Sequence, residues 1–444
     1  MEKRELIVVG AGAGGLMAAI TAARLGAQVT LLEGTGRCGR KLSQTGNGKC
    51  NFTNLSLTGN EYRSEDMTFP RQIIDAFPPE SVISFFESIG VLPKYRGSYV
   101  YPLSDQASTV TEALYWELKR LGVELRYDCA LQSLQANVGG SFLLDTAGGS
   151  FSAKAVILCM GSKAFPLTGS DGSGYRIAES LGLRVTPLAP ALCGLRAKNP
   201  RFAEMAGVRT EAGLTLTVNG EDRSEEFGEL QLTEYGISGI PVFQLSGRAG
   251  QALLRGEQVT VRIDFLPQLE TKKLKELLLD RRESMAALPA ERLLLGMLND
   301  KLALALLREA GILPEQSGIK GSGKGKKPDR KQKEKEKGIA YSGKKIREIS
   351  NEAMLLLLDL LKDYAAEIVS SQPFETAQCV SGGVDTREVY PESCECRKIP
   401  GLYLAGELLD VDGSCGGYNL QFAWSSAWLA GRAAAKKYNY CNNY

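Results

Sequence analysis

Histidine is absent from this 444-residue sequence, and its absence excludes several classes of enzyme. Histidine is the side chain whose unperturbed pKa lies nearest neutrality, and it is the commonest metal ligand. A Ser-His-Asp or Cys-His catalytic unit is therefore excluded, as is every metal site that requires an imidazole. Proton transfer must depend on tyrosine, cysteine, lysine, a carboxylate, water or a cofactor.

Long apolar runs and a strong net charge are also missing. No window of about 18 uncharged apolar residues occurs, so we expect no membrane-spanning helix. The formal net charge of +2 gives no overall attraction to nucleic acid or membrane. The opening MEKRELIVVG lacks the apolar core of a signal peptide. The ten cysteines fit neither a secreted disulfide scaffold nor paired zinc knuckles, so we expect reduced thiols, no metal site and a cytoplasmic protein.

The start of the chain has the order of a dinucleotide-binding unit. Leu6–Val9 is typical of a buried parallel strand, and it runs into the loop GAGAGG. A predicted helix follows and ends at Gly26, and Gln28–Leu32 is a second predicted strand. The glycines expected to contact the cofactor are Gly10, Gly12, Gly14 and Gly15.

Each part of this unit has a physical reason. Gly10 permits the tight turn, Gly12 lets backbone N–H groups approach a pyrophosphate, and Gly15 lets the helix pack on the strand. The helix N-terminus favours the phosphate charge. Glu33 closes the second strand and can accept hydrogen bonds from an adenosine ribose. An acid here, rather than an arginine, favours an unphosphorylated 2′-hydroxyl and hence FAD or NAD.

A second glycine-rich region near the end of the chain favours FAD. Ala155–Met160 and Leu402–Leu404 are further apolar strands, followed by Gly161 and by Ala-Gly-Glu respectively. A flavin is long and needs a second contact far from its adenosine, where the acid reaches the ribityl hydroxyls. In DGSCGGYNLQFAWSS, the glycines allow close approach, and a helix from Asn419 would point its N-terminus at the flavin N1–C2=O edge. The residues predicted to bind FAD here are Gly161, Gly406, Glu407, Asp412, Gly413, Gly417, Asn419 and Leu420.

Several motifs are spread over nearly the whole chain. They are GAGAGGLMAA, GRKLSQTGNGKCNFTN (39–54), YPLSDQASTV (101–110), GSDGSGYRIAESLG (169–182), VSGGVDTREV (380–389) and GLYLAGELLDVDGSCGGYNLQFAWSSAWLAG (401–431). Together they resemble a widespread bacterial FAD family labelled aminoacetone-oxidase-like or 3-dehydro-bile acid delta(4,6)-reductase-like. The resemblance adds Arg40 and Lys41, within the second motif, to the expected FAD contacts.

The resemblance implies an α/β fold with a Rossmann-type FAD-binding domain built from both chain ends, residues 1–190 and 371–444. It also implies an inserted antiparallel β-barrel domain at 191–268 and a small helical domain at 269–370 with a basic loop at 315–340. Composition supports an insertion independently. GLTLTV and QVTVRIDF are predicted strands within Leu192–Leu266, whereas Glu270–Leu313 and Ile346–Val369 have the leucine spacing of helices.

Two segments depart from the family pattern. The family's barrel strand carries Thr-His before Gly-x-Ser-Gly-Pro, but here LTEYGISGI has Glu234 in the histidine position and Ile240 in the proline position. Any role of that histidine is therefore in doubt for this chain. The family's Thr-Met-Glu-Ser-Lys run is SCECR here, so we interpret Cys394 and Cys396 as part of an ordinary connection rather than a zinc or redox pair.

The segment Lys320–Lys337, KGSGKGKKPDRKQKEKEK, is the one strongly basic run. Such a run is predicted to be disordered or loosely helical. It is either a solvated loop within the helical insert or an arm that contacts RNA phosphates. The solvated loop is the interpretation that we favour.

The resemblance implies two activities with one chemistry: reduction of a conjugated C=C bond in a 3-oxo bile acid intermediate, or of uracil C5=C6 in ribosomal RNA. Both need hydride on the β-carbon, a proton on the α-carbon and polarisation of a carbonyl. We favour the small-molecule enone over RNA, and a flavin oxidase of an amine such as aminoacetone is a third hypothesis. No second dinucleotide unit is visible, so NAD(P)H is expected to bind transiently as electron donor.

The absence of histidine directs attention to tyrosine as the proton donor. Tyr418 is the leading candidate because the GGYN motif places it at the expected flavin edge. Asn47 and Lys49 in TGNGKCN are candidates for the carbonyl or flavin contact. Tyr235, Tyr99 and Tyr101 are weaker candidates, because each fits ordinary packing equally well. Cys50 and Cys415 are also weaker, since a buried cysteine is usually inert. The oligomeric state is left open.

Overall fold

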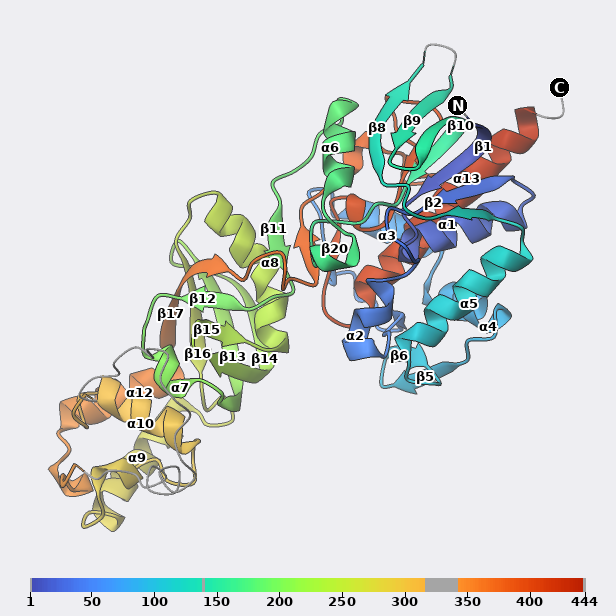
Figure 1. Cartoon of the computed structure of the whole chain (residues 1–444). Coiled ribbons are helices and arrows are strands. Elements are labelled where there is room, and N and C mark those ends of the chain that lie inside the picture. The colour runs from blue at the N-terminus through green and yellow to red at the C-terminus, as the bar shows by residue number, and fades with distance from the viewer. Residues whose placement is uncertain (1, 138–139, 316–341, 442–444) are drawn as a thin grey trace, which may run out of the picture. The chain divides into compact units, whose positions relative to one another are not determined.

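The computed structural model describes residues 2–137, 140–315 and 342–441 (Figure 1). The chain divides into two units. The first consists of Met1–Cys193, Ser246–Arg255 and Ser371–Tyr444, and the second consists of Gly194–Leu245 and Gly256–Ser370. The first unit is therefore formed by both ends of the chain. The basic run Lys320–Lys337 lies outside the described residues.

A mixed sheet forms the centre of the first unit, with strand order β7-β2-β1-β10-β9-β8 and β19 paired with β10. β1 pairs in parallel with β2 and β10, and β10 pairs in parallel with β19, so strands from both chain ends share one sheet. The bounds are β1 Glu2–Val9, β2 Val29–Leu32, β7 Glu124–Arg126, β8 Leu131–Ala136, β9 Phe142–Thr146, β10 Gly149–Leu158 and β19 Leu402–Leu404.

Helices cover this sheet, and α1 lies against α13 (Figure 1). The two helices approach closely at Gly431, where a Cβ would lie only 2.5 Å from the Ala18 carbonyl oxygen. The helices of the first unit are α1 Ala13–Arg24, α2 Thr45–Gly48, α3 Thr68–Ala76, α4 Pro79–Ser88, α5 Ala107–Arg120, α6 Ser173–Ser180 and α13 Tyr418–Cys441. Its short strands are β3 Thr53–Asn54, β4 Tyr62–Arg63, β5 Pro93–Arg96, β6 Tyr99–Pro102, β11 Ala189–Ala191, β18 Cys379–Ser381 and β20 Asp412–Gly413.

The second unit contains a closed antiparallel barrel with strand order β12-β15-β14-β13-β16-β17. The strands are β12 Leu195–Ala197, β13 Arg209–Val218, β14 Glu221–Thr233, β15 Gly236–Ser238, β16 Val259–Asp264 and β17 Tyr364–Ser371. Its helices are α7 Phe202–Met205, α9 Thr271–Ser284, α10 Asp300–Glu309 and α12 Asn351–Lys362. Helix α8, Ile240–Leu254, connects β15 to β16, and its residues from Ser246 onward belong to the first unit.

The fold class predicted from the sequence is confirmed: a Rossmann-type α/β unit accompanies a barrel and helices. One element was predicted wrongly. The helical spacing assigned to Ile346–Val369 ends at Lys362, and Tyr364–Ser371 is strand β17 of the barrel. Buried Tyr364, Ala366 and Ile368 alternate there with exposed residues, which is the period of a strand. The leucine-rich α12 immediately before it concealed this change of period.

None of the described helices combines the length and hydrophobicity that crossing a bilayer requires. Cys394 and Cys396 are buried free thiols, and burial raises the pKa of both. Both residues therefore pack as small apolar groups in the core of the first unit.

Candidate functional site

In the loop after β1, two glycines leave no room for a side chain, and a third faces open space. A Cβ on Gly10 would lie 2.4 Å from the Cys159 carbonyl oxygen, and one on Gly15 would lie 1.7 Å from the Gly10 carbonyl oxygen. A Cβ on Gly12 would meet no atom within 4 Å. Gly12 is the N-cap of α1 and provides no side-chain cap. The N-terminus of α1 therefore faces open space, which is what an entering phosphate requires.

Glu33 lies beside this loop and holds its backbone. One carboxylate oxygen accepts a hydrogen bond from Ala11 N at 2.8 Å. The other accepts from Thr35 N at 2.8 Å and from Thr35 Oγ1 at 2.7 Å. A carboxylate has about four acceptor positions, so Glu33 keeps capacity for one ribose hydroxyl. Gly14 packs on α13, where a Cβ would lie 3.8 Å from Ala423 O.

Segments from three parts of the chain meet at Glu407, in the 3₁₀ turn after β19. Lys41 Nζ lies 2.6 Å from Glu407 Oε2, and Ser162 Oγ donates to the same oxygen at 3.3 Å. Gly406 and Gly161 have φ of +71° and +72°, so both turns favour glycine. Arg40, next to Lys41, instead donates to the Leu167 carbonyl oxygen at 2.8 Å. The structure thus brings together predicted contacts from both chain ends.

The side chain of Asn419, in the first turn of α13, holds the backbone of the glycine-rich loop that precedes this helix. Asn419 accepts from Gly413 N and donates to Gly413 O, both at 2.8 Å. Gly416 and Gly417 have φ of +128° and +94°, and a Cβ on Gly416 would lie 2.9 Å from Tyr99 Cε1. Leu420 packs against the core of the unit. The loop can therefore present its backbone and the start of α13 to a ligand.

Asp412 was predicted to contact the cofactor, and the structure places its carboxylate inside the protein. It is 2% exposed, and Asp412 Oδ2 lies 3.5 Å from Arg63 Nη1. Burial raises the pKa of Asp412, whereas Arg63 and a hydrogen bond from Ser381 oppose that shift. Sequence reasoning did not single out Arg63 because no motif connects it to Asp412, 349 positions later.

The TGNGKC loop is an unusual backbone segment. Gly46, Asn47, Gly48 and Cys50 all have positive φ, between +53° and +79°. Asn47 and Lys49 are exposed and so are available to a ligand. Cys50 is buried, and burial raises the pKa of its thiol to about 12, so this candidate proton donor is held as an inert thiol.

The tyrosine candidates differ in what their hydroxyl groups contact. Tyr418 is 8% exposed and donates to the Ser56 carbonyl oxygen at 2.8 Å, and burial raises its pKa to about 12. Tyr99 also lies beside Gly416, is 42% exposed, and makes no hydrogen bond through its hydroxyl to any described residue. Tyr101 packs under Arg96, whose guanidinium carbon lies 4.9 Å from the ring centroid. Tyr235 belongs to the second unit.

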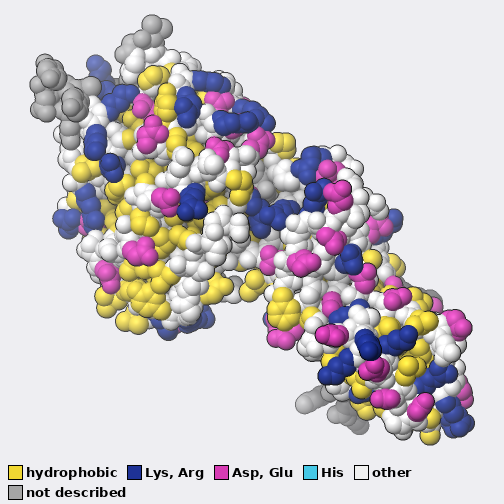
Figure 2. Space-filling model, turned by 180° about the vertical axis from the view of Figure 1, so that it is seen from behind, with side chains coloured by type: hydrophobic (Ala, Val, Ile, Leu, Met, Phe, Trp, Pro, Cys, Tyr) yellow, Lys and Arg dark blue, Asp and Glu magenta, His cyan; other side chains and the backbone are white. Residues whose placement is uncertain are grey.

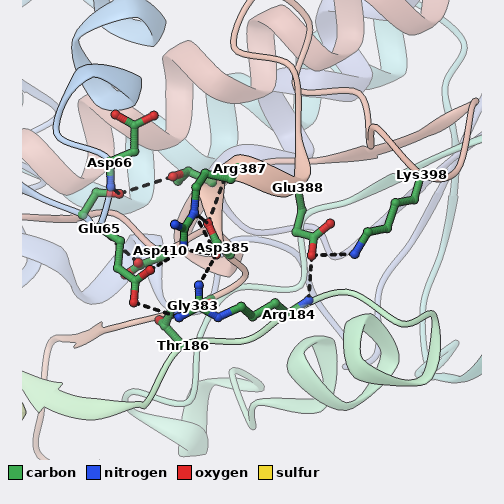
Figure 3. Close-up of polar contacts among 12 residues, drawn as sticks. Glu65, Asp66, Arg184, Thr186, Gly383, Asp385, Arg387, Glu388, Lys398 and Asp410 are labelled. Carbon is green, nitrogen blue, oxygen red and sulfur yellow. Dashed lines mark hydrogen bonds and ion pairs between the residues drawn. The ribbon is translucent and has the colours of Figure 1, made fainter.

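A network of ionic contacts surrounds Asp385, next to the segment that connects Glu407 to Asp412 (Figure 3). Asp385 accepts from Arg184 at 2.8 Å and from Arg387 at 2.7 Å, and both arginines also contact Glu65. Backbone bonds from Val384 N to Leu408 O and from Asp410 N to Val384 O join this network to the strand-like segment after Glu407. The network therefore positions the chain on which the second glycine loop is built.

Comparisons with known proteins agree with this architecture. A family model described as the HI0933-like protein Rossmann domain matches residues 4–433. The 3-dehydro-bile acid delta(4,6)-reductase of Clostridium scindens is 39% identical over 432 residues, covering 97% of this chain and 98% of the relative. The ribosomal RNA dihydrouridine synthase of Escherichia coli is 28% identical and covers 96% of this chain and 97% of the relative. The Haemophilus influenzae protein of the same name is 26% identical over 98% of this chain and 99% of that relative. The chain therefore belongs to the HI0933-like Rossmann family.

Proposed function

We propose that this protein is a FAD-dependent oxidoreductase that reduces a conjugated C=C bond of a small enone, with a 3-oxo bile acid or related steroid as the best candidate. The observation that carries the proposal is the glycine loop of α1, which is closed at Gly10 and Gly15 and open at Gly12. The bile acid reductase relative, matched along nearly its full length, supports the substrate class.

The residues at hand fit a FAD molecule held at two ends. The N-terminus of α1 and Glu33 would hold the pyrophosphate and adenosine ribose. Glu407 would bind the ribityl chain, with Lys41 setting its position through their 2.6 Å contact. The Gly416–Gly417 backbone and the start of α13 would face the flavin ring. When bound, FAD supplies hydride from its reduced N5, and NAD(P)H is the proposed transient electron donor.

The protein's own part in the chemistry is to polarise a carbonyl and deliver a proton. Asn47 and Lys49 are exposed donors in the TGNGKC loop and are proposed to orient the substrate carbonyl. Tyr418 and Tyr99 both lie beside Gly416 and are the proposed proton donors. The raised pKa leaves the Tyr418 hydroxyl protonated at neutral pH, and this O–H group is engaged as the donor of a hydrogen bond to the Ser56 carbonyl oxygen. Tyr99 has its hydroxyl available in the described structure.

Steady-state turnover with matched variants tests this proposal. NAD(P)H oxidation should depend on a 3-oxo-Δ4 bile acid, and the product should gain two hydrogens. Tyr99→Phe and Tyr418→Phe should be compared with Tyr95→Phe, which alters an exposed tyrosine on the neighbouring strand β5. Loss of about 100-fold or more in kcat in either proposed donor identifies the acid. Peroxide release in air without any enone would instead support an amine oxidase.

Ribosomal RNA is the second candidate substrate, because two relatives matched over most of the chain are ribosomal RNA dihydrouridine synthases. The run Lys320–Lys337 supplies the sequence feature that RNA binding would use. On the face of the described structure shown in Figure 2, basic and acidic side chains are interspersed. A gel shift with ribosomal RNA that disappears on deletion of 320–337, together with dihydrouridine formation, would favour RNA over the steroid.

A further inference from the structure

Asn51 has a buried amide oxygen that has no hydrogen-bond partner among the described residues. Its side chain is 8% exposed, and its Oδ1 is enclosed and accepts no hydrogen bond from any described residue. A buried acceptor without a donor destabilises the folded state, because it has given up its hydrogen bonds with water and gained none in the protein. Such a group in a native fold needs an explanation, and one explanation is a ligand that completes it.

Three other buried or partly buried amides of this region have a partner for their side-chain oxygen. Gln421 accepts from Thr53 Oγ1 and donates to Phe77 O at 2.9 Å. Asn54 donates to Gly416 O at 2.9 Å and accepts from Ser56 N at 3.0 Å. Asn419 both donates to and accepts from Gly413. Asn51 is therefore the buried amide of this region whose oxygen accepts no hydrogen bond from the described residues.

The unused acceptor lies at the start of α13. A Cβ on Gly417 would lie 2.9 Å from Asn51 Oδ1, and the first intrahelical bond of α13 runs from Gln421 N to Gly417 O. The N–H groups of the first turn precede that bond and are left as donors, together with the positive end of a 24-residue helix. One acceptor therefore lies beside a group of donors.

This arrangement complements an imide edge, in which a carbonyl oxygen and an N–H group stand side by side. We propose that Asn51 Oδ1 accepts a hydrogen bond from the N3–H group of the flavin ring, beside the α13 N-terminus that faces the C2 carbonyl. The inference rests on the proposed FAD function. Asn51 is then a positioning residue that fixes the register of the ring, and its unsatisfied state without ligand is what FAD binding relieves.

Asn51→Leu gives the first test, because the two possible roles predict opposite signs. Leucine removes the unsatisfied polar atom, so the full-length apoprotein should melt at the same or a higher temperature. Its affinity for FAD should fall roughly tenfold to hundredfold, because N3–H would then be buried without an acceptor. Asn60→Leu, at an exposed asparagine nine positions later in the sequence, should change neither quantity. If Asn51 had a purely structural role, Asn51→Leu would lower the melting temperature, and the ratio of the variant's FAD affinity to that of the wild type would stay near one.

A flavin analogue gives a second test that does not depend on the variant. In 3-deaza-FAD a C–H group replaces N3–H, so the wild-type protein should bind it roughly tenfold or more weakly than FAD. Asn51→Leu should bind both cofactors equally, since the interaction is already lost. Equal binding of FAD and 3-deaza-FAD by the wild type would overturn the inference and leave the FAD proposal intact. Failure of the wild type to bind FAD at all would overturn the proposed function itself.

Discussion

Replacing Asp410 with asparagine is expected to stabilise the first unit at neutral pH and above. Asp410 is 5% exposed, and among the described residues its carboxylate accepts a single hydrogen bond, from Glu65 N at 3.3 Å (Figure 3). Burial raises the pKa of this carboxyl to about 7, and the nearby charges of Asp412, Glu65 and Asp385 act in the same direction. Asparagine has the same shape and keeps an acceptor for Glu65 N.

The sign and size follow from linkage between proton binding and folding. The folded pKa of about 7 lies above the ordinary value of 3.8, so the folded state binds the proton more tightly. Wild-type stability should therefore fall as pH rises from about 4 to about 7 and then stay level. At about 1.4 kcal/mol per pKa unit, the full shift corresponds to about 4 kcal/mol. The advantage of Asp410→Asn should grow from near zero at pH 3.5 to a few kcal/mol at pH 8.

Urea unfolding followed by tryptophan fluorescence measures this difference, because Trp116, Trp424 and Trp428, the protein's three tryptophans, all belong to the first unit. Asp385→Asn is a control of opposite sign. Hydrogen bonds from Arg387 lower the pKa of Asp385, so its stabilisation is present above pH 4 and is lost as pH falls further. If Asp410→Asn were less stable than wild type at pH 8, Asp410 would be an ionised, stabilising group, and the reasoning would be refuted.

Two further predictions concern the cofactor loops. Gly12→Ala should leave the melting temperature of the apoprotein within about a degree but weaken FAD binding at least tenfold, because its Cβ enters open space that a phosphate would use, whereas Gly15→Ala should destabilise the fold itself. Calorimetry and flavin fluorescence separate the two outcomes, and equal effects of both variants would contradict this interpretation. Glu407→Gln should weaken FAD binding about threefold to thirtyfold, because it loses both the ribityl acceptor charge and the contact with Lys41. Unchanged flavin content after dialysis would place the ribityl chain elsewhere.

The first glycine unit could be predicted from sequence because all its parts are local. The strand, the loop and the acid at Glu33 follow one another, and each has a backbone requirement that only certain residues meet. The glycines at Gly10 and Gly15 are required by contacts that a Cβ would occupy. The short strand Leu402–Leu404 was predicted with its observed bounds because it is a compact apolar run.

The parts that sequence did not predict depend on pairings across long chain separations. The contacts of Lys41 with Glu407 and of Arg63 with Asp412 join residues more than 300 positions apart, and no spacing rule connects them. Strand β17 was missed because its alternation begins two residues after a leucine-rich helix ends. Asn51 was passed over in favour of Asn47, since both lie in TGNGKCN and only the fold shows which amide is buried.

One anaerobic single-turnover measurement tests the central proposal most directly. The flavin of the purified protein is reduced without oxygen, a 3-oxo-Δ4 bile acid is added, and recovery of the oxidised flavin spectrum is followed together with the product mass. The proposed function predicts rapid recovery and a product heavier by two hydrogens. Flavin that stays reduced with the steroid but is reoxidised by ribosomal RNA or by oxygen would contradict a steroid enone reductase.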